Sequence, residues 1–152
     1  MAIPSPHDYE TDIVAWSREQ AQWLKAGRFD RLDLEHLADE IEDVGKSEQR
    51  ELANRMAVLL THLLKWAHQP DRRSASWQVT IRNQRHGINR RLAKTPSLKA
   101  DLQQSDWWED VWADALAQAA QETGLAHFPE RCPWSEAQIL SADFWPADAR
   151  ER

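Results

Sequence analysis

The 152-residue sequence has one cysteine, four glycines and no long apolar run. With Cys132 alone, neither a disulfide framework nor a cysteine-rich zinc site can form. No stretch approaches the roughly 18 consecutive apolar residues of a membrane span, and residues 1–8 lack the pattern of a signal peptide. Elimination therefore predicts a cytoplasmic protein without a membrane partner. The sequence has no Gly-rich loop that would indicate phosphate binding and no elbow motif that would indicate a nucleophilic serine.

What is present is typical of one globular domain, with 41% hydrophobic and 29% charged residues. No segment alternates apolar and polar residues for long enough to form a sheet, whereas apolar residues recur at helical spacing. We therefore expect an all-α fold, an up-and-down bundle of four to six helices with a proline-rich C-terminal segment packed across it. The expected domain covers 8–146, with flexible termini at 1–7 and 147–152.

Glycines and prolines separate the periodic segments. Gly27 and Gly124 suit the left-handed position just after a helix, and Pro70 stops a helix because it lacks an amide hydrogen. The predicted helices are 8–26, 34–68, 76–94, one or two between 96 and 123, and a short one at 135–140.

The longest predicted helix, 34–68, has two apolar stripes that are out of phase. The first is Leu34, Leu37, Ile41 and Val44. The second is Leu52, Met56, Leu59, Leu60, Leu63 and Trp66. Both are expected to face inward. Because Gly45 lies at the change of phase, we expect a bend or interruption there, and two separate helices are the alternative. Asp33 is the expected N-cap of this helix.

Charge is unevenly distributed along the chain. Residues 8–64 have a formal net charge of −6, residues 65–94 of +7 and residues 95–152 of −7. We expect the basic segment to pack against the carboxylates of the long helix, which are Glu35, Asp39, Glu40, Glu42 and Asp43. The predicted ion network consists of Glu40, Glu42, Lys65, Arg82 and Arg85. In it Arg85 points inward and pairs with Glu40, because an unpaired buried charge is costly.

Part of the basic segment and one tryptophan form a second candidate surface. If Arg72, Arg73, Arg90 and Arg91 point outward, they can contact phosphates, and Trp77 can stack on a base. Trp107 lies off the apolar stripe of its helix, and an exposed Trp107 would mark a partner surface unless the C-terminal segment covers it.

A carboxylate-based metal enzyme is a third possibility. Asp39, Glu40 and Asp43 with a histidine offer the ligand types that helical bundles use. The spacing that such sites need occurs once, as Asp33-x-x-His36, where Asp33 is better explained as a cap. We therefore expect no catalytic residue, no metal and no cofactor.

Residues that are shared with a known protein family extend over almost the whole chain, from about 8 to 146. They include Tyr9, Asp12, Trp16, Leu37-Ala-Asp-Glu40-Ile-Glu42, Lys65-Trp66, Gln69-Pro70, Trp77, Gln84-Arg85, Pro96-Ser-Leu98, Glu122-Thr-Gly124, Phe128-Pro129 and Cys132-Pro133. In these residues the chain resembles the bacterial family called domain of unknown function 29. The resemblance implies a compact, all-helical bacterial protein and supplies no catalytic or cofactor residue.

The absence of a chemical motif favours an interaction role. We expect a protein-interaction or adaptor module without catalytic activity, whose partner is another protein or a second copy of the chain. The alternatives are a nucleic-acid-binding module that uses the basic helix 72–94 and the carboxylate-based metal-dependent enzyme.

Overall fold

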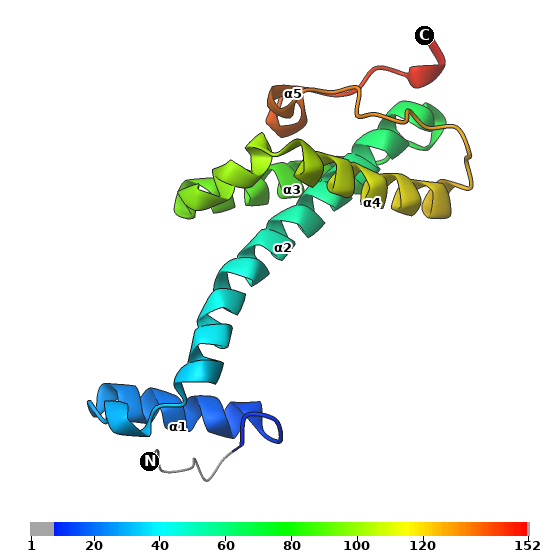
Figure 1. Ribbon diagram of the computed structural model, residues 1–152. Coiled ribbons are helices and arrows are strands. Elements are labelled where there is room, and N and C mark those ends of the chain that lie inside the picture. Colours follow the sequence, from blue (N-terminus) through cyan, green and yellow to red (C-terminus); the bar gives the residue numbers. More distant parts are fainter. Residues whose placement is uncertain (1–7, 152) are drawn as a thin grey trace. The chain divides into compact units, whose positions relative to one another are not determined.

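The computed structural model describes residues 8–151, and within this range it consists of helices without strands (Figure 1). The α-helices are α1 Ile13–Lys25, α2 Leu34–His68, α3 Ala75–Lys94, α4 Ser105–Thr123 and α5 Glu136–Leu140. The 3-10 helices are η1 Phe29–Arg31, η2 Pro70–Arg72, η3 Pro96–Gln103 and η4 Ala149–Glu151. The predicted all-α helical bundle is confirmed. None of these helices combines the length and the apolar character needed to cross a membrane.

Local signals set most of the helix ends. Gly27 and Gly124 follow α1 and α4 with φ angles of 72° and 73°, the left-handed conformation that favours glycine. Ser135 begins α5 with a complete capping box, in which Ser135 Oγ accepts from the Gln138 amide and Gln138 Oε1 accepts from the Ser135 amide. The expected flexibility of 1–7 lies outside the described residues, and that of 147–152 stays a prediction.

Helix α2 continues through Gly45 as one helix of 35 residues, so the predicted interruption and the two-helix alternative are wrong. A glycine within a helix costs about 1 kcal/mol relative to alanine. That cost is small for a helix whose later turns are held by tertiary packing.

The described residues form two compact units, unit 1 up to Ser47 and unit 2 from Glu48. Their boundary lies inside α2. The prediction of one domain over 8–146 stays a prediction, because one helix contributes to both units.

Unit 2 contains a large apolar core. The second stripe of α2 is fully buried, together with apolar residues of α3, η3 and α4 such as Ile81, Ile88, Leu98 and Ala115. The buried residues of the stripe are Leu52, Met56, Leu59, Leu60, Leu63 and Trp66. Their predicted inward orientation is confirmed.

Aromatic residues of the C-terminal segment lie against this core. The Trp145 ring is 4.6 Å from the Trp66 ring, and Trp134 contacts Trp112 edge-on at 6.0 Å. The indole N–H of Trp112 donates to the carbonyls of Pro129 and Glu130. Buried Trp112 thus combines apolar contact with a hydrogen-bond acceptor for its indole N–H.

Unit 1 has a much smaller interior. Within residues 8–47 the buried side chains are Trp16, Glu19 and Gln20, all on α1. Two of these three are polar, so hydrogen bonds contribute a larger share of the contacts between α1 and the start of α2 than they do in unit 2.

Candidate interaction surface

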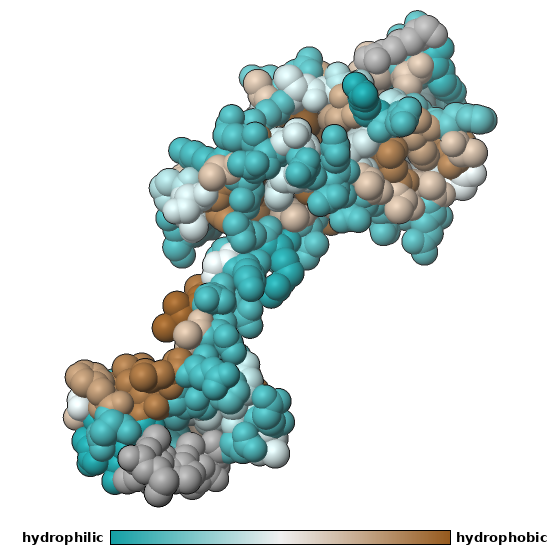
Figure 2. All heavy atoms as spheres, in the orientation of Figure 1, coloured by the Kyte–Doolittle hydropathy of each residue, from teal (hydrophilic) through white to brown (hydrophobic). Residues whose placement is uncertain are grey.

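The first apolar stripe of α2 lies in unit 1 and is largely exposed. Leu34, Ile41 and Val44 are 70%, 70% and 66% exposed, and Leu37 is half-buried. Their spacing of three, four and three residues places them on one face of the helix. Figure 2 shows hydrophobic side chains at the surface of α1 and of this part of α2.

Helix α1 adds apolar side chains to the same unit. Ile13, Val14 and Leu24 are each about half exposed. They line a groove of about 430 Å³ together with Leu37 and Glu40 of α2. We call this groove and the stripe, which share Leu37, the apolar surface of unit 1.

The prediction that the first stripe faces inward is therefore wrong for three of its four residues. Helical spacing identifies which residues share a face, but it does not show what covers that face. In unit 1 only Leu37 of the stripe lines the groove with α1. Isolated exposed apolar residues are ordinary, whereas a group on one face is typical of an interaction surface.

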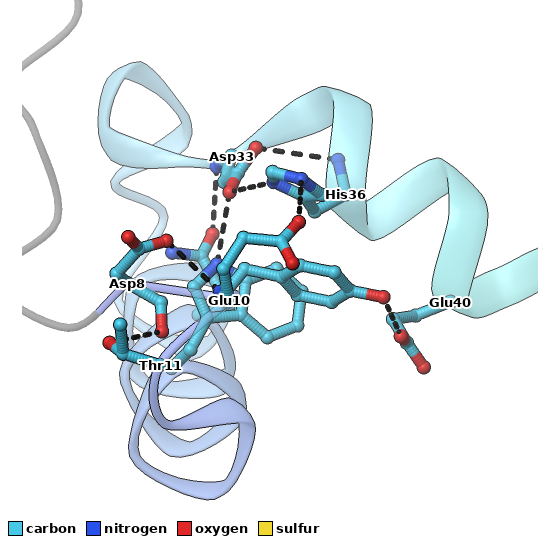
Figure 3. Close-up of polar contacts among 9 residues, drawn as sticks. Asp8, Glu10, Thr11, Asp33, His36 and Glu40 are labelled. Carbon is cyan, nitrogen blue, oxygen red and sulfur yellow. Dashed lines mark hydrogen bonds and ion pairs between the residues drawn. The ribbon is translucent and has the colours of Figure 1, made fainter.

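A polar network that includes Asp33 joins α1 to α2 beside this surface (Figure 3). One Asp33 oxygen accepts from the His36 amide at 3.3 Å, which confirms Asp33 as the N-cap. The other accepts from the Trp16 indole at 3.0 Å and lies 2.7 Å from His36 Nδ1. The Asp33 amide donates to Gln20 at 2.8 Å.

Tyr9 covers the other side of the histidine. The Tyr9 and His36 rings are stacked at 4.1 Å with 16° between their planes. The Tyr9 hydroxyl donates to Glu40 Oε1 at 2.5 Å, and Glu10 lies 3.8 Å from His36 Nε2. The network thus connects the turn before α1 with the first two turns of α2.

The surrounding carboxylates set the protonation of this network. The hydrogen bond to Asp33 raises the pKa of His36 above its usual value, which favours the imidazolium. Burial raises the pKa of Asp33, but hydrogen bonds from His36 and Trp16 outweigh burial and hold that pKa below its usual range. The hydrogen bond to Glu40 raises the pKa of Tyr9 to about 12.

The geometry of the network suits positioning better than chemistry. An Asp–His pair can orient an imidazole for proton transfer, but His36 Nε2 faces the carboxylate of Glu10 and the Tyr9 hydroxyl is already bonded to Glu40. For the described part of the chain, no group of three His, Cys, Asp or Glu residues is placed to hold a metal ion.

The comparisons with known proteins identify the family. The family model described as Domain of unknown function DUF29 matches residues 9–145. The chain belongs to this family. It is also similar to a crystal structure of an α-helical protein of unknown function from Rhodospirillum rubrum, at 25% identity and a TM-score of 0.53, over 92% of this chain and 93% of that one. None of the curated proteins matches the chain.

Among the described residues of this DUF29 chain, the predicted ion network is not assembled. Lys65 pairs with Glu122 at 3.1 Å rather than with a carboxylate of α2, and Glu40 accepts from Tyr9. Glu42 and Arg82 are exposed, and the Arg82 guanidinium lies 6.0 Å from the Trp145 ring.

Arg85 is buried, 2% exposed, as its inward register predicts. Its partner differs from the predicted Glu40, because Arg85 Nε donates to the Ile139 carbonyl at 2.8 Å and the guanidinium lies 5.6 Å from the Trp145 ring. Within residues 8–151 its Nη1 and Nη2 atoms have no hydrogen-bond partner. Burial lowers the pKa of Arg85.

The predicted carboxylate partners of the basic helix also need correction. Arg91 of α3 pairs with Glu48 and Glu51 of α2 at 3.0 and 3.5 Å, and these two carboxylates lie outside the predicted set. Arg91 is therefore not free to serve as the outward contact of the nucleic-acid alternative.

The other residues of the second candidate surface have different environments. Arg72 and Arg90 are exposed, while half-buried Arg73 donates to the Trp66 carbonyl and lies over the Trp66 ring. Trp107 is half-buried against the core and contacts Trp108 edge-on at 5.0 Å. Arg90 shares a hollow with Arg91, and Arg72, Arg73 and Trp107 do not line it.

Proposed function

We propose that this DUF29 chain is a protein-interaction module whose binding surface is the apolar surface of unit 1. The observation that supports it is the exposed stripe Leu34, Ile41 and Val44 on one face of α2. Such a stripe is the contact seam of paired helices, where each apolar side chain inserts between residues of the facing helix. Burying an isoleucine side chain contributes about 1.5–3 kcal/mol.

The charge of unit 1 indicates the chemistry of the partner. Residues 8–47 contain eleven acidic and five basic residues, a formal net charge of −6. Asp39, Glu42 and Asp43 are exposed within the same turns as the stripe. Opposite charge favours encounter and like charge disfavours it. We therefore infer that the partner segment is a basic amphipathic helix, and that pairing of two copies through unit 1 is disfavoured.

The nucleic-acid alternative has less support. Arg73 and Arg91 are engaged within the chain, and the face of Trp77 is covered by the Lys65 ammonium 4.8 Å from its ring. Base stacking on this face of Trp77 would require displacing that lysine.

The proposal is tested with a labelled synthetic helix of three heptads that has leucine at the core positions and lysine elsewhere. Fluorescence anisotropy of the full chain with this peptide should show saturable binding at physiological salt. A peptide with glutamate in place of lysine should bind far more weakly.

Matched serine variants locate the binding. Ile41→Ser should weaken binding at least about tenfold, because the lost apolar contact is formed only in the complex. Val79→Ser, a 52% exposed apolar position of unit 2, is the control and should change little. Equal binding of both peptides, or equal weakening by both variants, contradicts the proposal. A dimer in sedimentation equilibrium that Ile41→Ser dissociates would show that a second copy is the partner instead.

A further inference from the structure

Unit 2 has a hollow of about 380 Å³ beside the last turns of α3. Its lining includes four cationic side chains, Arg55, Arg90, Arg91 and Lys94, and one carboxylate, Glu48. This volume lies at the lower end of the range of about 300–1,000 Å³ that is usual for small-molecule pockets. Two basic residues at the end of a helix would suit the helix dipole, but Arg55 comes from α2 and has no such role.

Gly87 opens the wall of the hollow nearest to Arg55. A β-carbon at Gly87 would lie 3.2 Å from Arg55 Nη1, so glycine lets the guanidinium approach the backbone of α3. Glu51 holds the same guanidinium, since Arg55 Nε donates to Glu51 Oε1 at 3.0 Å. A helix-interior glycine is unfavourable by itself, and this close approach gives it a reason.

The charges of the hollow do not cancel. Glu48 and Glu51 together hold Arg91, and Glu51 is shared with Arg55. Within residues 8–151, Arg90 and Lys94 are exposed and have no ion pair. Four cations facing two carboxylates leave a formal charge of +2, in a molecule whose total is −6.

We propose that this hollow binds the phosphate group of a small molecule, with Arg90 and Lys94 as the principal contacts and Arg55 as a positioned third donor. A phosphate monoester has a charge of about −1.5 to −2 at pH 7, which matches the local excess. Arginine presents paired N–H groups to phosphate oxygens, and lysine adds a point charge. A small ligand feels mainly this local charge, whereas a long polyanion would also meet the negative charge of the whole chain.

The test is an amide NMR titration of the full chain at low salt with inorganic phosphate and, separately, with a nucleoside monophosphate. We expect saturable shifts at Gly87 and Thr95 with at least one of these probes. Arg90→Gln and Lys94→Gln should each weaken binding about tenfold, since each removes a charged hydrogen bond. Arg50→Gln, an exposed α2 position outside the hollow, is the charge-matched control and should change binding less than twofold.

Gly87→Leu fills the hollow without changing any charge and should abolish the shifts. If that variant unfolds, Arg90→Gln and Lys94→Gln, at exposed positions, still test whether the hollow binds phosphate. Equal affinity for both probes supports recognition of the phosphate alone, and tighter binding of the nucleotide supports a phosphate ester. Absence of saturation with both probes, equal weakening by Arg50→Gln, or affinity that rises with the length of a single-stranded oligonucleotide would overturn the proposal.

Discussion

Two stripes of the same helix have opposite environments. In unit 2 the stripe from Leu52 to Trp66 is buried under α3 and α4, while in unit 1 Leu34, Ile41 and Val44 are at least 66% exposed. Both stripes have the spacing of an amphipathic helix. Unit 2 is therefore stabilised mainly by apolar burial, and unit 1 by hydrogen bonds around Asp33 that leave its apolar residues available to a partner.

The two units should differ most in how much free energy of unfolding is lost when a residue of the apolar stripe is truncated to alanine. Leu60→Ala, at a fully buried position, should lower the free energy of unfolding by about 3 kcal/mol, because it removes apolar contacts and leaves a cavity. Ile41→Ala should change it by no more than about 0.5 kcal/mol. Urea unfolding followed by circular dichroism measures both. Similar losses would mean that the first stripe is covered in solution.

A smaller loss is expected from the polar network of unit 1. Asp33→Ala removes the N-cap of α2 and the acceptor of the Trp16 indole, and it should cost about 1–2 kcal/mol. Hydrogen exchange should show the loss in the amides of α1 and the first turns of α2. Asp30→Ala, at an exposed position of η1 that pairs with Arg28, is the control and should leave those amides unchanged. Unchanged exchange in Asp33→Ala would show that hydrogen bonds do not stabilise unit 1.

Replacing the buried cation Arg85 of unit 2 with methionine should raise the free energy of unfolding, whereas the preceding substitutions lower it. Arg85→Met keeps most of the side-chain volume and removes a charge whose Nη atoms have no hydrogen-bond partner within residues 8–151. Stability should rise by up to about 1 kcal/mol, because methionine avoids the desolvation cost of the buried guanidinium. Arg85→Ala should instead lose stability through the cavity. A loss above about 2 kcal/mol for Arg85→Met in urea unfolding would show that the Ile139 and Trp145 contacts outweigh the buried charge.

The pH dependence of unit 1 should be the smallest effect. Because the pKa of His36 is raised in the folded chain, protonated His36 adds stability that is complete below its unfolded pKa of about 6.5. That contribution is lost as pH rises through the higher folded value. An NMR titration of the imidazole should give a pKa above that of an unfolded histidine, and Asp33→Asn should lower it. An identical titration in both proteins would contradict the hydrogen bond.

Local signals and long-range packing differed in how well the sequence predicted them. Gly27, Pro70, Gly124 and Ser135 set helix ends through short-range geometry, so those ends were predictable. The exposure of Ile41 was not, because periodicity says nothing about what covers a face.

The polar contacts show the same limit. Asp33 was predictable as a cap, but the stacking of Tyr9 on His36 joins residues far apart in sequence and has no local signal. For Arg85, the inward register predicted its burial. The choice of the Ile139 carbonyl as acceptor depends on where the C-terminal segment lies, which spacing does not encode.

Amide shift mapping of the full chain with the lysine-rich synthetic helix tests the interaction surface most directly. We predict that the shifts are confined to α1 and to residues 34–44, and that Ile41→Ser removes them. Shifts centred on α3 and α4, or no shifts at concentrations that saturate the anisotropy signal, would contradict it.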